Sequence, residues 1–164
     1  MIILVEGIDR VGKTTLCKIL SDRFGFPISK DDTRYYGSHN NVDINTEKDN
    51  TFVNLIEQGC IDNVIFDRFH LTEYVYSYIE RGVKNDAMID IDNRLSKLDV
   101  LLIFVLPVDI KWSSREHGSD LTKHQKLFEK MYEQSKLNKY RCTYFSYDMC
   151  IDEVERRLNN GTSK

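Results

Sequence analysis

Residues 6–15 read EGIDRVGKTT, and this stretch decides the fold that we predict for the chain. Positions 7–14 match the phosphate-binding pattern GxxxxGK[ST] at every fixed residue. An apolar run at residues 2–5 precedes the match, and an amphipathic helical pattern follows it at residues 13–24. Glycines let such a loop curl until several backbone N–H groups converge, and this nest holds phosphate oxygens at the start of a helix. The sequence therefore predicts a strand, a nucleotide-binding loop and a helix.

The side chains of this loop predict ATP and Mg²⁺ as its ligands. In this pattern the lysine, Lys13, reaches the β- and γ-phosphates, and the hydroxyl of Thr14 coordinates Mg²⁺. The phosphates are then the counter-charge of the lysine. We expect the nucleotide to contact Gly7, Ile8, Asp9, Arg10, Val11, Gly12, Lys13, Thr14 and Thr15.

Outside the loop, short apolar runs alternate with helical patterns along the whole chain. The runs at residues 2–5, 64–67 and 100–106 are apolar throughout, which is typical of parallel strands covered on both faces. We expect further strands at 26–30 and 144–147, and helices at 13–24, 46–58, 72–81, 86–98, 121–139 and 151–158, with a short helix ending near 114. This alternation predicts one three-layer α/β domain over residues 1–164, a P-loop fold with a central, mostly five-stranded parallel sheet.

Composition and charge limit the classes of partner. The chain has a net charge of −3, with 41 % apolar and 30 % charged residues, which suits a soluble globule and does not favour non-specific binding to nucleic acid. No stretch approaches the ~18 apolar residues that span a bilayer, and the first apolar run is too short for a signal peptide. The four cysteines follow no metal-binding pattern. We therefore expect a cytoplasmic protein without a membrane partner.

Two other P-loop classes fit the sequence poorly. A GTPase needs an NKxD motif after a strand, and residues 138–141 read NKYR, without the aspartate. An ATPase that activates water normally has an acidic residue after the aspartate that ends the third strand. Here Arg68 follows Asp67, and a guanidinium suits anion binding better than water activation.

Taken together, EGIDRVGKTT and DRFHLTEYVYS at residues 67–77 resemble the thymidylate kinase and deoxynucleoside kinase branch of the P-loop kinases. The resemblance implies that Arg10 is a catalytic arginine inside the loop, as in thymidylate kinases whose lid lacks that arginine. It would touch the transferring phosphoryl group and stabilise the charge of the transition state. The plain alternative is a solvated surface charge.

The same resemblance assigns roles to three other charged residues. Arg68 would grip the 5′-phosphate of the acceptor, for which bidentate guanidinium recognition is suited, and the alternative is a surface salt bridge. Asp67 would lie near Mg²⁺ and the acceptor oxygen. Asp9 would meet the 3′-hydroxyl of the acceptor sugar or a Mg²⁺-bound water, with Glu6 at the end of the first strand as its support.

The resemblance places further residues around the acceptor. These are Lys30, Arg34, Phe52, Phe69, Thr72 and Tyr76. Either Lys30 or Arg34 would replace a phosphate-gripping arginine that the family carries after its second strand. Tyr76 would lie near the base, whereas Phe52 is either a stacking platform for the base or a core residue.

Residues 113–120 form the candidate lid over ATP. The segment contains one glycine and several small residues, so mobility is expected, and a plain solvent loop is the alternative. By resemblance, Arg115 at the base of the lid would lie against adenine or phosphate. The family also often forms homodimers, and the helix at 46–58 or at 72–81 would supply the contact.

The combined prediction is an ATP- and Mg²⁺-dependent kinase that phosphorylates a deoxynucleoside 5′-monophosphate. The first candidate for this acceptor is dTMP or a related pyrimidine nucleotide. A deoxynucleoside kinase is the main alternative, and there Asp67 must accept the proton of a neutral 5′-hydroxyl. Two further alternatives are a kinase that acts on a modified base in DNA and a nucleotide-binding regulator without turnover. The sequence does not choose the base.

Overall fold

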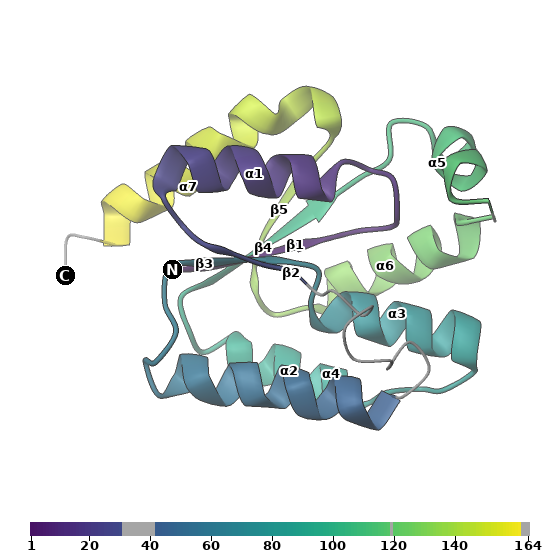
Figure 1. The fold of residues 1–164 in the computed structure, drawn as a ribbon, viewed down its shortest axis with the longest axis horizontal. Coiled ribbons are helices and arrows are strands. Elements are labelled where there is room, and N and C mark those ends of the chain that lie inside the picture. The colour runs from purple at the N-terminus through teal and green to yellow at the C-terminus, as the bar shows by residue number, and fades with distance from the viewer. Residues whose placement is uncertain (31–41, 119, 162–164) are drawn as a thin grey trace.

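In a computed structural model, which describes residues 1–30, 42–118 and 120–161, the chain forms a β-sheet flanked by helices (Figure 1). Within these residues the sheet has five strands, all parallel, in the order β2-β3-β1-β4-β5. The strands are β1 (Ile2–Glu6), β2 (Ile28–Lys30), β3 (Val64–Asp67), β4 (Val100–Val105) and β5 (Asn138–Cys142). The predicted α/β fold with a five-stranded parallel sheet is confirmed.

The three central strands form the core of the sheet. Strand β1 lies between β3 and β4, with Ile2 opposite both Val64 and Val100, and every residue of the three strands is buried. Their side chains meet helices on both faces, which explains why these strands are apolar throughout. On β4, for example, Phe104 stacks on Phe128 of the helix that covers it, with the ring centroids 6.0 Å apart.

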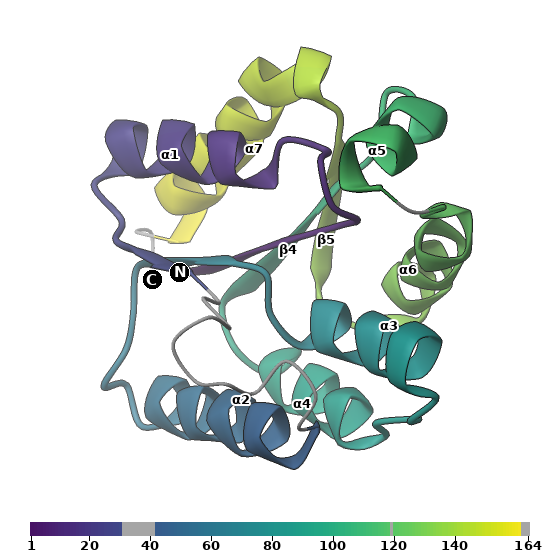
Figure 2. The ribbon, with the colours of Figure 1, turned by 45° about the vertical axis from the view of Figure 1, so that its right-hand side comes forward.

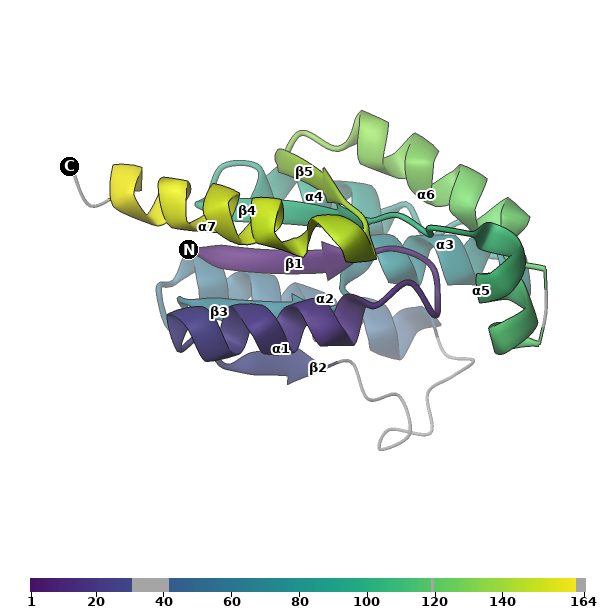
Figure 3. The ribbon, with the colours of Figure 1, turned by 90° about the horizontal axis from the view of Figure 1, so that it is seen from above.

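Helices cover both faces of the sheet. Helices α1 (Lys13–Phe24) and α7 (Tyr147–Gly161) lie together on one face, as Figures 1 and 2 show. The other face carries α2 (Val42–Glu57), α3 (His70–Arg81), α4 (Ala87–Leu95) and α6 (Thr122–Gln134), with α6 beside α3. The short helix α5 (Ile110–His117) lies beyond the carboxyl ends of the strands (Figure 3). Among the described helices, none has the length and apolar content needed to cross a membrane.

The last strand lies at β5 and not at the predicted residues 144–147. Helix α6 ends at Gln134, because Ser135 leaves the helical conformation with a ψ of 139°, so the predicted helix does not continue to 139. As an edge strand, β5 has mostly exposed or half-buried side chains and lacks the apolar run that marks the central strands. The predicted strand is instead a 3-10 helix, η2 (Tyr144–Ser146), where the N–H of Thr143 donates to Ser146 Oγ at 2.9 Å.

Residues 113–117 of the candidate lid belong to helix α5, so the short helix expected to end near 114 continues to 117, and the lid role stays a prediction. Helix α5 starts where Asp109 Oδ1 accepts a hydrogen bond from the N–H of Lys111 at 2.8 Å. It continues to His117 and ends at Gly118, which has a left-handed φ of 83°. Helix α2 likewise begins at Val42, before the predicted residue 46.

Candidate active site

The candidate site lies beyond the carboxyl ends of the central strands. The P-loop follows β1, Asp67 ends β3 with Arg68 directly after it, and α5 follows β4 (Figure 3). Parallel α/β sheets bind their ligands at this edge, because the loops that leave neighbouring strands converge there. The fold therefore brings together motifs that are separated by about 60 to 100 residues in the sequence.

The two fixed glycines of the P-loop permit close backbone contacts. Gly7 has a φ of 141°, and a Cβ atom there would lie 2.5 Å from the carbonyl oxygen of Val105. Gly12 has a φ of 96°, and its Cβ would lie 2.3 Å from the hydroxyl of Tyr147. Any other residue would therefore strain the loop and also displace a neighbour. Glycine at both positions lets the backbone take the tightly curled, concave shape that a phosphate-binding loop requires.

Tyr147, at the start of α7, supports this loop and was not predicted as a site residue. Its hydroxyl donates to the carbonyl oxygen of Gly12 at 2.8 Å. Burial raises the pKa of Tyr147, so the hydroxyl remains a donor at physiological pH. Sequence reasoning placed residues 144–147 in a strand, and no local signal connects them to a loop 135 residues earlier.

Lys13 is buried at the start of α1, with only 4 % of its surface exposed. Its Nζ donates to the carbonyl oxygen of Ile8 at 2.5 Å and lies 3.9 Å from Asp9 Oδ1. Burial, together with the positive charge of Arg68, lowers the pKa of Lys13 to about 7 from its ordinary value. A phosphate beside this amine would favour its charged form, so Lys13 fits an anionic ligand.

Thr14 and Asp67 meet as the metal prediction requires. The Thr14 hydroxyl donates to Asp67 Oδ2 at 2.6 Å. Asp67 is 1 % exposed, and no described residue forms a hydrogen bond with its Oδ1 atom. A buried carboxylate oxygen rarely lacks a partner, and hard oxygen ligands are those that Mg²⁺ prefers. These two residues therefore fit a magnesium ion that takes its other ligands from water and phosphate.

Asp9 connects the P-loop to two other elements. Its Oδ1 atom forms an ion pair with Arg68, and its Oδ2 atom lies 3.2 Å from Nε2 of His117, at the end of α5. Burial would raise the pKa of Asp9, but Arg68 and Lys13 outweigh it and hold this pKa below its ordinary value. The carboxylate is therefore charged at neutral pH and holds the arginine at the site.

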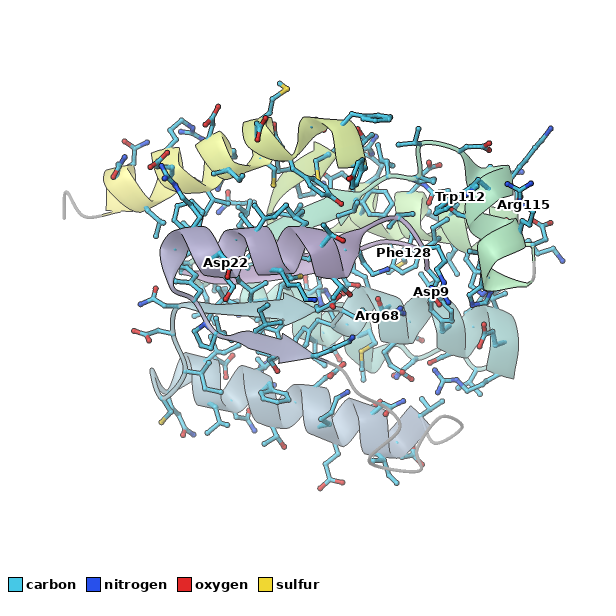
Figure 4. All side chains as sticks on the ribbon, turned by 45° about the horizontal axis from the view of Figure 1, so that its top comes forward. Asp9, Asp22, Arg68, Trp112, Arg115 and Phe128 are labelled. Atoms are coloured by element: carbon cyan, nitrogen blue, oxygen red, sulfur yellow. The ribbon has the colours of Figure 1, made fainter. Side chains whose placement is uncertain are left out.

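Arg68 occupies a special backbone position directly after β3. It has a left-handed φ of 81°, and its N–H donates to the carbonyl oxygen of Val5 at 3.1 Å. Figure 4 shows Arg68 and Asp9 close together, between Asp22 on one side and Arg115 on the other. Burial opposes the charge of Arg68, but the Asp9 carboxylate raises its pKa above the ordinary value. The half-buried guanidinium forms the salt bridge that was given as the alternative, and its role at the acceptor phosphate stays a prediction.

Glu6 contacts the start of α3 and not Asp9, contrary to the role expected for it. Its Oε1 atom accepts hydrogen bonds from the N–H groups of Phe69, at 3.0 Å, and Leu71, at 3.1 Å. Its Oε2 atom accepts from the hydroxyl of Thr72, so this hydroxyl, expected at the acceptor, already has a partner. Burial raises the pKa of Glu6, although His70 and Thr72 act in the opposite direction. Glu6 thus connects β1 to the helix that follows Arg68.

The aromatic residues expected at the acceptor divide into two groups. Phe52 packs edge-on against Phe66, with ring centroids 5.3 Å apart, and Phe69 is buried beside both. This environment favours the core interpretation of Phe52. Tyr76 instead faces α6, where its ring lies 4.8 Å from that of His124.

The remaining predicted cations lie around the rim of the site. Arg10 is exposed on the P-loop with a φ of 64°, and Lys30 is exposed at the end of β2, paired in register with Asp67. Arg115 is exposed on α5, near Trp112 in Figure 4. Arg34 lies outside the described residues. His117 and His124, which contact this site, were not predicted, because neither histidine belongs to a recognisable motif.

The fold is that of the P-loop nucleoside and nucleotide kinases. The YorR protein of Bacillus subtilis, determined in complex with phosphorylated GDP, superposes with a TM-score of 0.77 and 20 % identity over 100 % of this chain and 99 % of that chain. Deoxyadenosine kinase of M. mycoides gives a TM-score of 0.58 and 18 % identity, covering 98 % of this chain and 100 % of that chain.

Thymidylate kinase of Candida albicans gives a TM-score of 0.55 and 18 % identity, covering 98 % of this chain and 92 % of that chain. No protein-family model matches the sequence, and a sequence search of curated proteins finds no match. The similarity to these kinases is thus a similarity of fold, in line with the resemblance that the motifs indicated.

Proposed function

We propose that the protein is an ATP- and Mg²⁺-dependent kinase that phosphorylates a deoxynucleoside 5′-monophosphate, with dTMP or a related pyrimidine nucleotide as the first candidate. The observation that carries this proposal is the convergence of Lys13, the Thr14–Asp67 pair and the Asp9–Arg68 pair at one edge of the sheet. Lys13 and the P-loop backbone from Gly7 to Thr15 would hold the phosphates of ATP. Magnesium ATP supplies the phosphoryl group when it is bound.

Arg68 would hold the 5′-phosphate of the acceptor. It is a charged guanidinium, kept in place by Asp9, close to the lysine that would bind the donor phosphates. The positive charge of Arg68 is also part of the reason why the pKa of Lys13 is low. A site with these two positive charges suits two anionic groups better than one. Lys30, on the neighbouring strand end, would assist Arg68.

The chemistry of such an acceptor requires positioning more than proton removal. A phosphate monoester is already ionised near pH 7, so no strong general base is needed. Arg10, exposed on the P-loop, would stabilise the transferring group, and α5 with Arg115 would cover the donor. Thr14 and Asp67 would hold Mg²⁺, which neutralises phosphate charge.

A deoxynucleoside kinase is the second candidate, and one observation favours it. The unpartnered Oδ1 atom of Asp67, without a hydrogen bond from any described residue, is free to accept the proton of a 5′-hydroxyl. The similar structures do not decide between the two acceptors, since one is a deoxyadenosine kinase and another a thymidylate kinase.

The test is a panel of deoxynucleosides and their 5′-monophosphates, incubated with ATP and Mg²⁺ and followed by mass. We expect turnover of a monophosphate, with kcat/KM reduced by at least about a hundredfold in Arg68→Ala, because a charge-assisted contact to phosphate is lost. Arg23→Ala, which removes an exposed arginine paired with Glu155 at 3.1 Å, is the matched control and should retain activity.

Each other outcome contradicts the proposal in a different way. Phosphorylation of nucleosides alone, insensitive to Arg68→Ala, would favour the deoxynucleoside kinase and make Asp67→Asn the next variant. Binding of ATP without turnover of any small acceptor would point to an acceptor in DNA or to a regulator.

A further inference from the structure

Helix α4 carries one charged residue in its buried stripe. The stripe repeats at helical spacing over Met88, Ile91, Asp92 and Leu95, and all four residues are buried. The three apolar ones belong to the core. A carboxylate in such a stripe is costly unless hydrogen bonds replace those that it makes with water. The position of Asp92 therefore has a reason beyond packing.

Asp92 obtains its hydrogen bonds from two other parts of the fold. Its Oδ1 atom accepts from Nε2 of His70, at 3.0 Å, and from Ser135 Oγ, at 2.7 Å. Its Oδ2 atom accepts from the N–H of Lys136 at 3.1 Å. Burial would raise the pKa of Asp92, but His70 and the other two donors outweigh it and hold this pKa below its ordinary value. The charged carboxylate thus connects α4 to the start of α3 and to the turn between α6 and β5.

His70 is the first residue of α3 and has no exposed surface. A charged carboxylate only accepts hydrogen bonds, so Nε2 of His70 is the donor to Asp92. The other ring nitrogen, Nδ1, has no hydrogen-bond partner among the described residues. Within that part of the chain, the contact with Asp92 is therefore the hydrogen bond that fixes the orientation of the ring.

His70 lies two positions after Arg68, whose left-handed φ of 81° persists only where the surroundings hold it. Between the two, Phe69 caps α3 without a side-chain hydrogen bond. Two carboxylates from other elements hold this segment. Glu6 of β1 accepts from the N–H of Phe69 at 3.0 Å, and Asp92 of α4 holds the ring of His70. A relaxation of the backbone at Arg68 would have to disturb both contacts.

We propose that His70 and Asp92 are positioning residues that keep the guanidinium of Arg68 at the acceptor phosphate. The inference rests on the proposed function, since it takes Arg68 as the group that binds this phosphate. Without the contact, the first turn of α3 would lose this connection to α4, and the guanidinium its fixed direction toward Asp9. Misplacement of a binding group by about 1 Å costs up to about a hundredfold in rate.

The test is a double-mutant cycle between His70→Leu and Arg68→Ala, measured on a deoxynucleoside monophosphate that the wild type uses. His70→Leu removes the donor to Asp92 and keeps an apolar side chain in the core. We expect kcat/KM for the monophosphate to fall by about tenfold, mainly through the KM for the monophosphate, with the KM for ATP unchanged. In the Arg68→Ala background the same substitution should have little further effect, because it acts through Arg68.

Three further variants separate this role from a general loss of stability. His70→Gln, whose terminal amide can donate to Asp92, should restore most of the activity. His70→Phe keeps a ring in the core without a donor, and it should reproduce the effect of His70→Leu if the latter does not fold. Val154→Ala leaves a cavity in α7, on the other face of the sheet (Figures 1 and 2), and should lower the melting temperature without changing the KM for the monophosphate.

Additive losses in the double variant would overturn the proposal, since a general loss of stability does not depend on Arg68. An unchanged KM for the monophosphate in both His70→Leu and His70→Phe would overturn it as well, while leaving the kinase activity in place. A wild type that phosphorylates no monophosphate would refute the proposed function itself, and this role of His70 with it.

Discussion

At the scale of single residues, the protonation state of Lys13 depends on whether a phosphate is bound beside it. Burial lowers its pKa to about 7, while the pKa of a lysine in an unfolded chain stays near 10.5. Below pH 7 the folded protein thus carries a buried ammonium at a cost in free energy of unfolding. Between about pH 7 and 10.5 the unfolded chain binds more protons than the folded one, so this contribution becomes more favourable as the pH rises.

Lys13→Met should therefore raise the melting temperature of the nucleotide-free protein near pH 7 and flatten its dependence on pH between 7 and 10. The same variant should lose the stabilisation that magnesium ATP gives the wild type, because the lysine that binds the phosphates is gone. Thermal melting across this pH range, with and without magnesium ATP, measures both effects. Lys18→Met, at an exposed position on the same helix, is the control. A variant that melts below the wild type at pH 7 would contradict the account of Lys13.

At the scale of elements, the junction of β3 and α3 explains how Arg68 keeps an unusual backbone conformation. A left-handed φ is unfavourable for a residue with a Cβ and persists where the surroundings hold it. Here Glu6, at the end of β1, accepts hydrogen bonds from the backbone of Phe69 and Leu71 and from the hydroxyl of Thr72. One buried carboxylate therefore fixes the start of α3 relative to β1.

Glu6→Gln should test this connection, because an amide cannot accept at both of its terminal atoms. We expect the free energy of unfolding to fall by about 2 kcal/mol, since a buried donor loses its acceptor. Turnover of the acceptor should fall as well, through the displaced Arg68. Urea denaturation measures the loss of stability, and Glu155→Gln, which changes an exposed glutamate on α7, should leave it unchanged. Equal stability of Glu6→Gln and the wild type would show that the carboxylate is not needed at this junction.

At the scale of the whole molecule, a helix late in the sequence supports the P-loop near its beginning. Helix α7 packs beside α1 on one face of the sheet, and its first residue, Tyr147, donates to the carbonyl oxygen of Gly12 (Figures 1 and 3). The absence of a Cβ at Gly12 makes room for that hydroxyl. The shape of the nucleotide-binding loop thus depends on residues near the end of the chain.

Tyr147→Phe should weaken this dependence without disrupting the core. We expect a loss of about 1 kcal/mol in the free energy of unfolding and a several-fold rise in the KM for ATP, with kcat little changed. Steady-state kinetics against ATP, together with urea denaturation, supply both numbers. Tyr144→Phe, at an exposed position on η2, is the matched control. An unaltered KM for ATP in Tyr147→Phe would mean that the P-loop holds its shape without this hydrogen bond.

Much of the sheet and part of the site follow from local sequence signals. The P-loop pattern at residues 7–14 and the uninterrupted apolar runs of β1, β3 and β4 are local features, because a strand buried on both faces needs apolar side chains at every position. The meeting of Thr14 with Asp67 was also predictable, because carboxyl ends of neighbouring parallel strands share one edge. Strand β5 could not be predicted in this way, since an edge strand with solvated side chains carries no apolar run.

By itself, the sequence determined the class of fold, the phosphate-binding loop and the charged motif at residues 67 and 68, because each depends on neighbouring residues. Only the tertiary structure decided the partners of Asp9 and Glu6, the support of Gly12 by Tyr147 and the pairing of Tyr76 with His124. These contacts join residues 59 to 135 positions apart in the first three cases and 48 apart in the last (124 − 76). Contacts at such separations arise from the packing of helices against the sheet, which no local pattern encodes.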